Sequence, residues 1–337
     1  MTLSPLDIQP VVEAAIAATA TARIGPGRYA RWIGTLKKNS PAIDDLNPYG
    51  CADAANILYT LGHFPREDEE RAASISVIQS LQNAATGLFS EDTHHPYHVT
   101  AHCVAALELF DARPIHPLIE LRTLDAPGAL EDFLDGLNWA EGPWEASHQG
   151  AGIYAAKVLC EESDSEWEER YFSWLWQQAD PQTGLWRRGR LFTPESKPLF
   201  HHLAGSFHYL FNHEYARRPQ RYPARLIDLC LEIRTKNLWP PLGTEISFSD
   251  IDWVYCLTRS LRQCSHRGEE ARQILSSFAD QFCGFLLDRI NTMPVPFDDI
   301  HLLFGSLCAL AELQTALPGH LTTRKPLRLV LDRRPFI

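Results

Sequence analysis

Apolar and polar positions follow a pattern that repeats six times along this 337-residue chain. In each repeat, a loop rich in Gly, Pro and aromatic residues leads into an apolar, Ala-rich run that opens on polar residues. The repeat length is about 50 residues, which is typical of repeat architectures. The six apolar runs begin at Cys51, His98, His148, His201, Asp250 and Asp298.

Segments of a second kind lie between the apolar runs, and each is charged on one side and apolar on the other. Within residues 66–82, Ile75, Ile78 and Leu81 form an apolar stripe at helical spacing, which is typical of a helix with one buried face. The equivalent segments span about 128–138, 163–178, 222–237 and 268–290, and an opening one runs from about Asp7 to Leu36.

We therefore predict an all-α fold with a single domain over residues 1–337: an (α/α)6 toroid of six helical hairpins. The apolar runs would form the inner ring and the amphipathic segments the outer ring. The repeats would span about residues 40–315, with an N-terminal outer helix in 1–39 and a partly extended tail in 316–337. Gly87, Gly184 and Gly243 precede inner runs, where glycine allows a tight turn and the next apolar residue can hold the loop against the core.

The charge and the cysteine content indicate which partners and which cellular compartment to expect. The net charge is −11 and the Lys and Arg residues are scattered, so we expect neither a nucleic-acid partner nor binding to anionic membranes. The eight cysteines contain no CxxC pair, and several lie in apolar runs, where Cys usually acts as a small buried hydrophobe. The N-terminal stretch lacks the features of a signal peptide. We expect a cytoplasmic protein of unspecified oligomeric state.

Two stretches resemble known α/α-toroid families. Residues 82–110 (QNAATGLFSEDTHHPYHVTAHCVAALELF) resemble a repeat of the terpenoid cyclase/prenyltransferase group. Residues 174–189 (WLWQQADPQTGLWRRG) resemble the Asp-Pro-x-Thr-Gly-Leu-Trp loop of unsaturated-glycuronyl hydrolases, which are six-hairpin glycosidases with lyase and epimerase relatives. With the regular period, the resemblance covers roughly residues 40–315. It implies the fold and leaves the reaction open, because such rings carry many activities.

The chain lacks the full residue sets that carry out the two reactions of the cyclase/prenyltransferase group. Class II terpene cyclases use a DxDD acid, whereas this chain has Asp250-Ile251-Asp252-Trp253, with Trp in place of the last carboxylate. Protein prenyltransferases bind zinc through Asp, Cys and His. The comparable positions here would be Asp250, Asp252 and His301, with no Cys between the acids.

Four carboxylates are candidate catalytic groups, because Asp250 and Asp252 open the fifth inner run and Asp298 and Asp299 open the sixth. Neighbouring helices of a ring would bring the two pairs together, and crowded carboxylates have pKa values pushed apart, which supplies an acid and a base. The alternative is that Asp250 and Asp298 are ordinary helix N-caps. Asp252 and Asp299 are harder to explain in that way.

Histidines supply the second set of candidates. We predict a general acid or base among His102, His148 and His202, because imidazole titrates near neutral pH. His98 and His102 share a helix face and could bind a metal, but a metal site needs a third ligand. We therefore predict no cofactor and leave a metal open. A structural histidine bonded to a loop carbonyl is the third possibility.

Candidate substrate-binding residues stand in the loops and first turns of the inner runs. The aromatic side chains could stack on sugar faces or shield a carbocation, or could simply pack the loops onto the core. Arg188, in a cluster with Arg187 and Arg190, could pair with a uronate or diphosphate, or be a solvated loop residue. The full set is Tyr49, Tyr97, His98, Trp144, Trp186, Arg188, Trp253, Tyr255 and His301.

The expected function is acid/base catalysis on a uronate-containing or short oligosaccharide substrate, as a hydrolase, lyase or epimerase. The alternative is a terpenoid or prenyl cyclase-like or dehydratase-like enzyme without DxDD. A second alternative is a non-catalytic ring that binds a ligand or partner. The sequence contains no Walker loop, GxGxxG, GxSxG or HExxH motif, which disfavours the corresponding enzyme classes.

Overall fold

The computed structural model describes residues 5–33, 46–238 and 241–336, and this part of the chain is mostly helical. The all-α prediction is confirmed. The even-numbered helices are α2 (Pro48–Thr60), α4 (Pro96–Leu109), α6 (Pro143–Leu159), α8 (Leu199–Tyr215), α10 (Ser249–Gln263) and α12 (Ile300–Ala316). The odd-numbered helices are α1 (Gln9–Ala22), α3 (Asp68–Ser80), α5 (Ala129–Gly136), α7 (Ser165–Gln178), α9 (Pro223–Thr235) and α11 (Gly268–Thr292).

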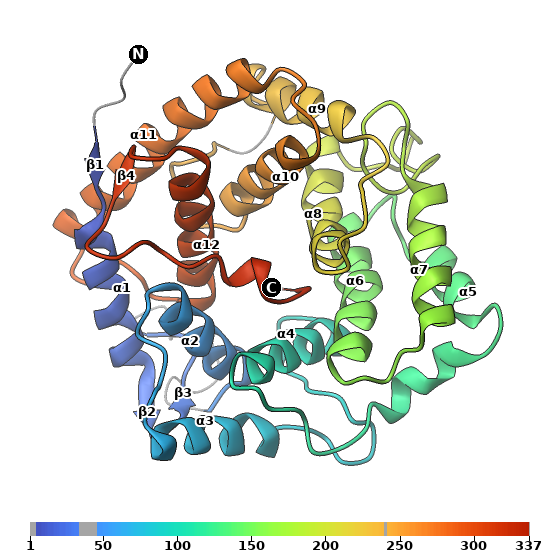
Figure 1. The fold of residues 1–337 in the computed structure, drawn as a ribbon, viewed down its shortest axis with the longest axis horizontal. Helices are drawn as coiled ribbons and strands as arrows, with labels where there is room; N and C mark the ends of the chain where they lie inside the picture. The colour runs from blue at the N-terminus through green and yellow to red at the C-terminus, as the bar shows by residue number, and fades with distance from the viewer. Residues whose placement is uncertain (1–4, 34–45, 239–240, 337) are drawn as a thin grey trace.

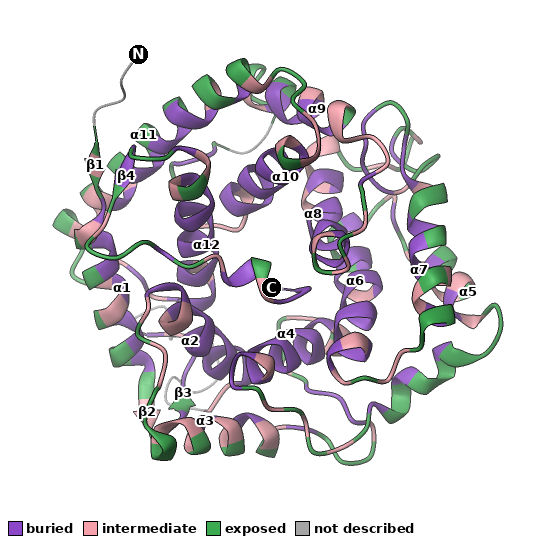
Figure 2. Ribbon diagram, viewed as in Figure 1, coloured by how far each residue is buried: buried purple, intermediate pink, exposed green. Residues whose placement is uncertain are grey.

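The even-numbered helices lie around the centre of the molecule, and the odd-numbered helices lie outside them (Figure 1). Each even-numbered helix contacts the next one, and α12 contacts α2, so the contacts form a closed circuit. We call the contact between α12 and α2 the seam. Figure 2 shows that the inner helices are buried almost throughout, whereas the outer helices have one buried and one exposed face. No helix within the described ranges is long and apolar enough to cross a membrane.

Most inner helices begin a few residues before the predicted starts. Helices α2, α4 and α6 begin at Pro48, Pro96 and Pro143, because proline suits the first helical turn, where its missing N–H leaves no hydrogen bond unmade. The sixth inner helix behaves differently: it begins at Ile300, after the predicted Asp298, and Asp299 is its N-cap. Capping by Asp298, the alternative to a catalytic role for this residue, is therefore not observed, because the cap is the next residue.

The predicted opening helix is too long. Helix α1 ends at Ala22, and β2 (Arg23–Gly25) and β3 (Arg28–Tyr29) then form a short antiparallel hairpin. Its turn contains Pro26 and Gly27, and Gly27 has a φ of +64°, which a helix does not accommodate. The last residues of the predicted segment, 34–36, lie outside the described residues.

Two loops that lead into inner helices have the same internal hydrogen bonds. In the first, the Asn83 side chain accepts the backbone N–H groups of Ala85 and Thr86, and Gly87 takes a φ of +79°. In the second, Asp180 accepts from Gln182 and Thr183, and Gly184 takes a φ of +78°.

The residue two positions after each of these glycines fixes the loop to an inner helix. The Phe89 N–H donates to Thr100 Oγ1 of α4 at 2.9 Å, and the Trp186 N–H donates to Ser206 Oγ of α8 at 3.0 Å. The predicted tight turn and anchoring of these loops are confirmed.

The segment after α12 runs from the edge of the molecule to its centre (Figure 1). β4 (Leu321–Thr322) first pairs in parallel with β1 (Leu6–Asp7). The chain then passes the end of α2, where the Arg328 N–H donates to Thr60 O, and includes the short 3-10 helix η3 (Val330–Asp332). Figure 1 shows it ending near the centre, where Phe336 packs against His98 and His208.

Candidate functional site

Three inner helices each place a buried histidine near the centre of the molecule. His98 of α4, His148 of α6 and His208 of α8 form the group that we call the histidine triad. The ring centroids of His98 and His148 are 4.0 Å apart, and those of His148 and His208 are 4.8 Å apart. One ligand nitrogen from each ring lies within 4.8 Å of the others, which is the spacing of candidate metal ligands.

Hydroxyl groups bond two of the three rings. Tyr49 Oη is hydrogen-bonded to His98 Nδ1, and Ser147 Oγ to His208 Nδ1 at 3.0 Å. His148 Nε2 is buried and has no hydrogen-bond partner among the described residues. Burial lowers the pKa of His208 to about 3 and holds the pKa values of His98 and His148 well below their usual range. Burial therefore favours the neutral form of all three imidazoles.

A second buried group lies across the seam. Asp53 of α2 accepts from His102 Nε2 of α4 at 2.8 Å and from His301 Nδ1 of α12 at 3.1 Å, both through Oδ1. We call these three residues the Asp53 triad. Burial alone would raise the pKa of Asp53, but His301 and His102 hold it well below the usual range, so the carboxyl is ionised. The burial of His102 lowers its own pKa to about 4. This triad also has metal-ligand spacing.

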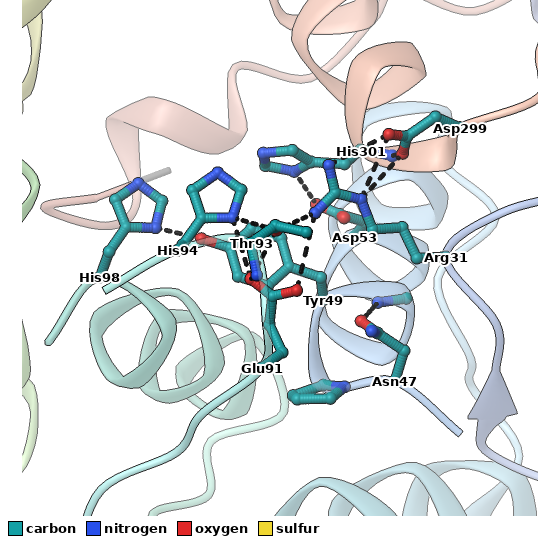
Figure 3. A network of polar contacts seen from close by, with 12 residues as sticks. Arg31, Asn47, Tyr49, Asp53, Glu91, Thr93, His94, His98, Asp299 and His301 are labelled. Carbon is teal, nitrogen blue, oxygen red and sulfur yellow. Dashed lines mark hydrogen bonds and ion pairs between the residues drawn. The ribbon is translucent and has the colours of Figure 1, made fainter. Parts of the chain in front are cut away.

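The Tyr49 ring connects the two triads. It stacks on His102 with centroids 4.8 Å apart and on His98 at 5.8 Å, and it meets the edge of His301 at 4.6 Å. His94 covers Tyr49 at 4.6 Å, and its Nδ1 is 3.0 Å from Glu91 Oε1. Figure 3 shows this network from close by.

A buried ion pair holds the neighbouring part of the seam together. The Arg31 guanidinium contacts both carboxylate oxygens of Asp299 at 3.1–3.2 Å, and its Nη1 donates to Thr93 Oγ1 at 2.7 Å (Figure 3). Asp299 also accepts the His301 N–H, which makes it the N-cap of α12. The sequence disfavoured capping for Asp299, but the structure gives it that role together with the ion pair.

A cavity of about 570 Å³ opens beside the two triads. We call it the mouth cavity, because the loops before α6, α8 and α10 and the first turns of these helices line it. Two of its aromatic residues also contact the buried histidines. Trp144 meets His148 with centroids 4.3 Å apart, and Phe248 meets His301 at 4.5 Å. Other lining residues are Glu141, Glu145, Lys197, His201 and Asp252.

Asp252 is the acidic residue of α10 that reaches the mouth cavity. It is 3% exposed, and Oδ1 has no hydrogen-bond partner in the part of the chain that the structure describes. Burial, helped by the nearby Asp250, raises its pKa well above the usual range. Asp250 instead accepts the Gly243 N–H at 2.7 Å, and burial raises its pKa to about 7. Burial thus favours the protonated form of Asp252, the form that is able to donate a proton.

Several other candidates lie away from both triads. Trp186 and Trp253 donate their indole N–H groups to Leu175 O of α7 and Cys230 O of α9, so both pack between the inner and outer helices. Tyr255 is buried against Arg259.

The remaining candidates have separate environments. Tyr97 donates to Glu120, and Arg188 is exposed. His202 is buried, with neither ring nitrogen hydrogen-bonded within the described ranges. Asp298 is half-buried, and its backbone oxygen accepts the Ile33 N–H.

Sequence reasoning missed Asp53, His208, Glu91 and Arg31 as site residues. One signal could have identified Asp53: it is a lone acid in the apolar run CADAANILYTLG, where an unpaired charge would be costly. The repeat offers a second signal. Asp53 and His102 are 49 residues apart, and so are Tyr49 and His98, so both pairs occupy equivalent places in successive repeats.

Comparisons with known proteins give no relatives from which to infer a role. A scan against models of protein families finds no match, and searches of curated protein sequences and of solved structures find none either.

Proposed function

We propose that the two rows of helices form an (α/α)6 toroid, and that the protein is an enzyme acting by acid/base catalysis in the mouth cavity. The closed circuit of inner-helix contacts supports the toroid. It also supports a relationship to the six-hairpin glycosidases and the terpenoid cyclase group, whose repeats the chain resembles.

The observation that carries the proposed function is Asp252, a buried carboxyl on the cavity wall with an unpaired oxygen among the described residues and a pKa raised by burial. A carboxyl kept neutral at pH 7 is suited to general acid catalysis. Glu141 and Glu145 line the same cavity and would supply the carboxylate that acts as base or nucleophile.

The other lining residues favour a carbohydrate substrate. The Trp144 side chain is 37% exposed, so its ring is accessible for stacking on a sugar. Lys197 places a cation on the cavity wall, where it would pair with a uronate carboxylate. A short oligosaccharide containing a uronic acid combines an apolar sugar face with one negative charge. We therefore favour a hydrolase, lyase or epimerase for such substrates over a prenyl-group enzyme.

Activity assays with two asparagine variants test this function. The wild-type protein would be screened for turnover of uronates, unsaturated disaccharides and neutral oligosaccharides, with prenyl diphosphates as the competing substrate class. Asp252→Asn removes the transferable proton and should lower kcat by about 100-fold or more, the usual contribution of a general acid. Asp250→Asn, two residues away, should lower it far less.

The possible outcomes separate the alternatives. Equal losses in the two variants would mean that Asp252 has no special role. Turnover of a prenyl diphosphate without turnover of glycans would replace the carbohydrate proposal with the terpenoid one. Ligand binding without turnover, unchanged by Asp252→Asn, would indicate a non-catalytic binding ring.

A further inference from the structure

We propose that the histidine triad, His98, His148 and His208, binds a divalent transition-metal ion such as Zn²⁺ through its three imidazoles, with a coordination position left for a further ligand. This site does not depend on the function proposed above, because metal binding can be measured without a substrate.

The three ligands come from three neighbouring inner helices, which hold them in place. His98, His148 and His208 are all buried, and their ligand nitrogens lie within 4.8 Å of one another. In a tetrahedral zinc site with Zn–N bonds of about 2.0–2.1 Å, ligand nitrogens are about 3.3 Å apart. A change of about 1 Å in each ring position would reach this geometry, which a small side-chain rotation achieves.

The hydrogen bonds of the triad match those of metal-bound histidines. A histidine that binds a metal through one nitrogen usually donates its other N–H to an oxygen acceptor, which fixes the tautomer. His98 Nδ1 is bonded to Tyr49 Oη and His208 Nδ1 to Ser147 Oγ. In both rings, Nε2 remains as the nitrogen available to a metal. His148 Nε2, which has no partner in the described residues, would be the third ligand.

An occupied triad also explains why three imidazoles meet in the buried interior. Buried ring nitrogens without hydrogen bonds are destabilising, and three histidines in contact offer each other little compensation unless a cation accepts their lone pairs. The charge of a divalent ion would be partly offset by the nearby carboxylates. Asp53 and Glu91 both act electrostatically on Tyr49, whose hydroxyl is bonded to His98, and Glu91 also contacts His94 at 3.0 Å. Imidazole ligands suit Zn²⁺, Cu²⁺, Ni²⁺ and Fe²⁺ better than Mg²⁺ or Ca²⁺.

A fourth coordination position would lie close to the mouth cavity, because Trp144 contacts both the cavity and His148. A metal with three protein ligands keeps such a position for water or substrate oxygen. The ion would then lower the pKa of a bound water or polarise a substrate oxygen.

Metal titration of the full chain tests the proposal. The protein would be treated with a chelator, dialysed, and titrated with Zn²⁺ alone by calorimetry and with Co²⁺ alone by visible absorption. We expect one equivalent to bind, with Co²⁺ absorption typical of tetrahedral nitrogen coordination. Loss of one ligand in His148→Ala or His208→Gln should weaken binding by more than the 10–100-fold typical of outer-shell changes. Tyr49→Phe removes only the hydroxyl that bonds His98 Nδ1 and should weaken metal binding by an amount within that range.

His213→Ala is the matched control, because His213 is also a buried histidine of α8 with neither ring nitrogen bonded in the described part of the chain. It should bind metal like the wild type. Circular dichroism identifies any variant that fails to fold. Two ligand variants, His148→Ala and His208→Gln, are used so that the test remains if one of them does not fold. The proposal is overturned if the wild type binds no stoichiometric metal, or if His148→Ala and His208→Gln bind normally. Loss of metal in His301→Ala but not in His148→Ala would assign the ion to the Asp53 triad and also overturn it.

Discussion

At the scale of single residues, two carboxyls on the first turn of α10 have different surroundings although only one residue separates them. Asp250 faces the loop that contains Gly243 and accepts its N–H, whereas Asp252 lines the mouth cavity. Residues i and i+2 of a helix point in different directions, so the two carboxyls meet different surroundings. Both are buried, and burial favours the protonated form of each.

The raised pKa of Asp250 predicts a pH dependence of stability. Its folded value of about 7 exceeds the ordinary 3.8, so the native state holds more protons than the unfolded state between these values. Stability must therefore fall as pH rises through this window. Asp250→Asn removes that cost, and at pH 8 it should raise the free energy of unfolding by up to about 4 kcal/mol relative to its effect at pH 4.

Urea denaturation of wild type and variant at both pH values measures this difference. The asparagine retains an oxygen for the Gly243 N–H, so the comparison isolates the charge. A stability difference that is the same at pH 4 and pH 8 would show that Asp250 does not titrate in this range.

At the scale of elements, the loops between outer and inner helices determine where each inner helix begins. Gly87 has a φ of +79°, and a Cβ there would lie 1.9 Å from Pro117 O. Gly128, before α5, has nearly the same φ of +80° but open space around it. Substitutions at these two glycines therefore distinguish the cost of a positive φ from the added cost of a steric clash.

Alanine substitution should affect these positions differently. Gly128→Ala should cost roughly 1–2 kcal/mol, the strain of a left-handed alanine. Gly87→Ala should cost more than about 3 kcal/mol, because the methyl group must also displace the Pro117 backbone. Thermal or urea unfolding of both variants measures the difference, and equal losses would mean that the loop moves aside easily.

Helix α12 depends on Asp299, which caps its first turn and pairs with Arg31. Asp299→Ala should lower the free energy of unfolding by about 2–3 kcal/mol, because it removes the cap of α12 and the charge-assisted hydrogen bonds to the buried Arg31, which keeps Glu91 at 3.9 Å as its remaining ion-pair partner. Arg113→Ala is the control, since its ion pair with Glu161 is more than half exposed on both sides and should contribute less than about 1 kcal/mol. Asp299→Asn can still cap the helix, so its loss in free energy of unfolding, measured by urea denaturation, should lie between those of Asp299→Ala and Arg113→Ala. A loss no larger than that of Arg113→Ala would contradict this role.

At the scale of the whole molecule, local patterns in the sequence predicted the helices well. The amphipathic period identified α3, α5, α7, α9 and α11 within a few residues of their observed bounds, because one face of each is exposed. The inner helices carry no such contrast. They are buried on all sides, so the sequence does not distinguish a side chain facing the centre from one facing the outer helices.

Because the inner helices lack a contrast between buried and exposed faces, only some of the site residues were predicted. His102 and His148 were identified because imidazole titrates near neutral pH, His98 because it shares a helix face with His102, and His301 from the comparison with prenyltransferases. The structure brings the four together around Tyr49 and within the two triads. Trp186 and Trp253 had an equally suggestive position but pack toward the outer helices. Arg31 could not be identified, because its importance comes from Asp299, which is 268 residues away and reaches it only across the seam.

The seam also has a consequence for the order of folding. Asp53 bonds His102 across 49 residues and His301 across 248 residues. Since the entropic cost of closing a loop grows as (3/2)RT ln n, the second contact costs about 1.4 kcal/mol more chain entropy than the first. Contacts between successive hairpins can therefore form early, while the junction of the last hairpin with the first forms late. The Asp53 triad would be among the final parts of the protein to assemble, and the seam would be among the first places to open when the native state fluctuates.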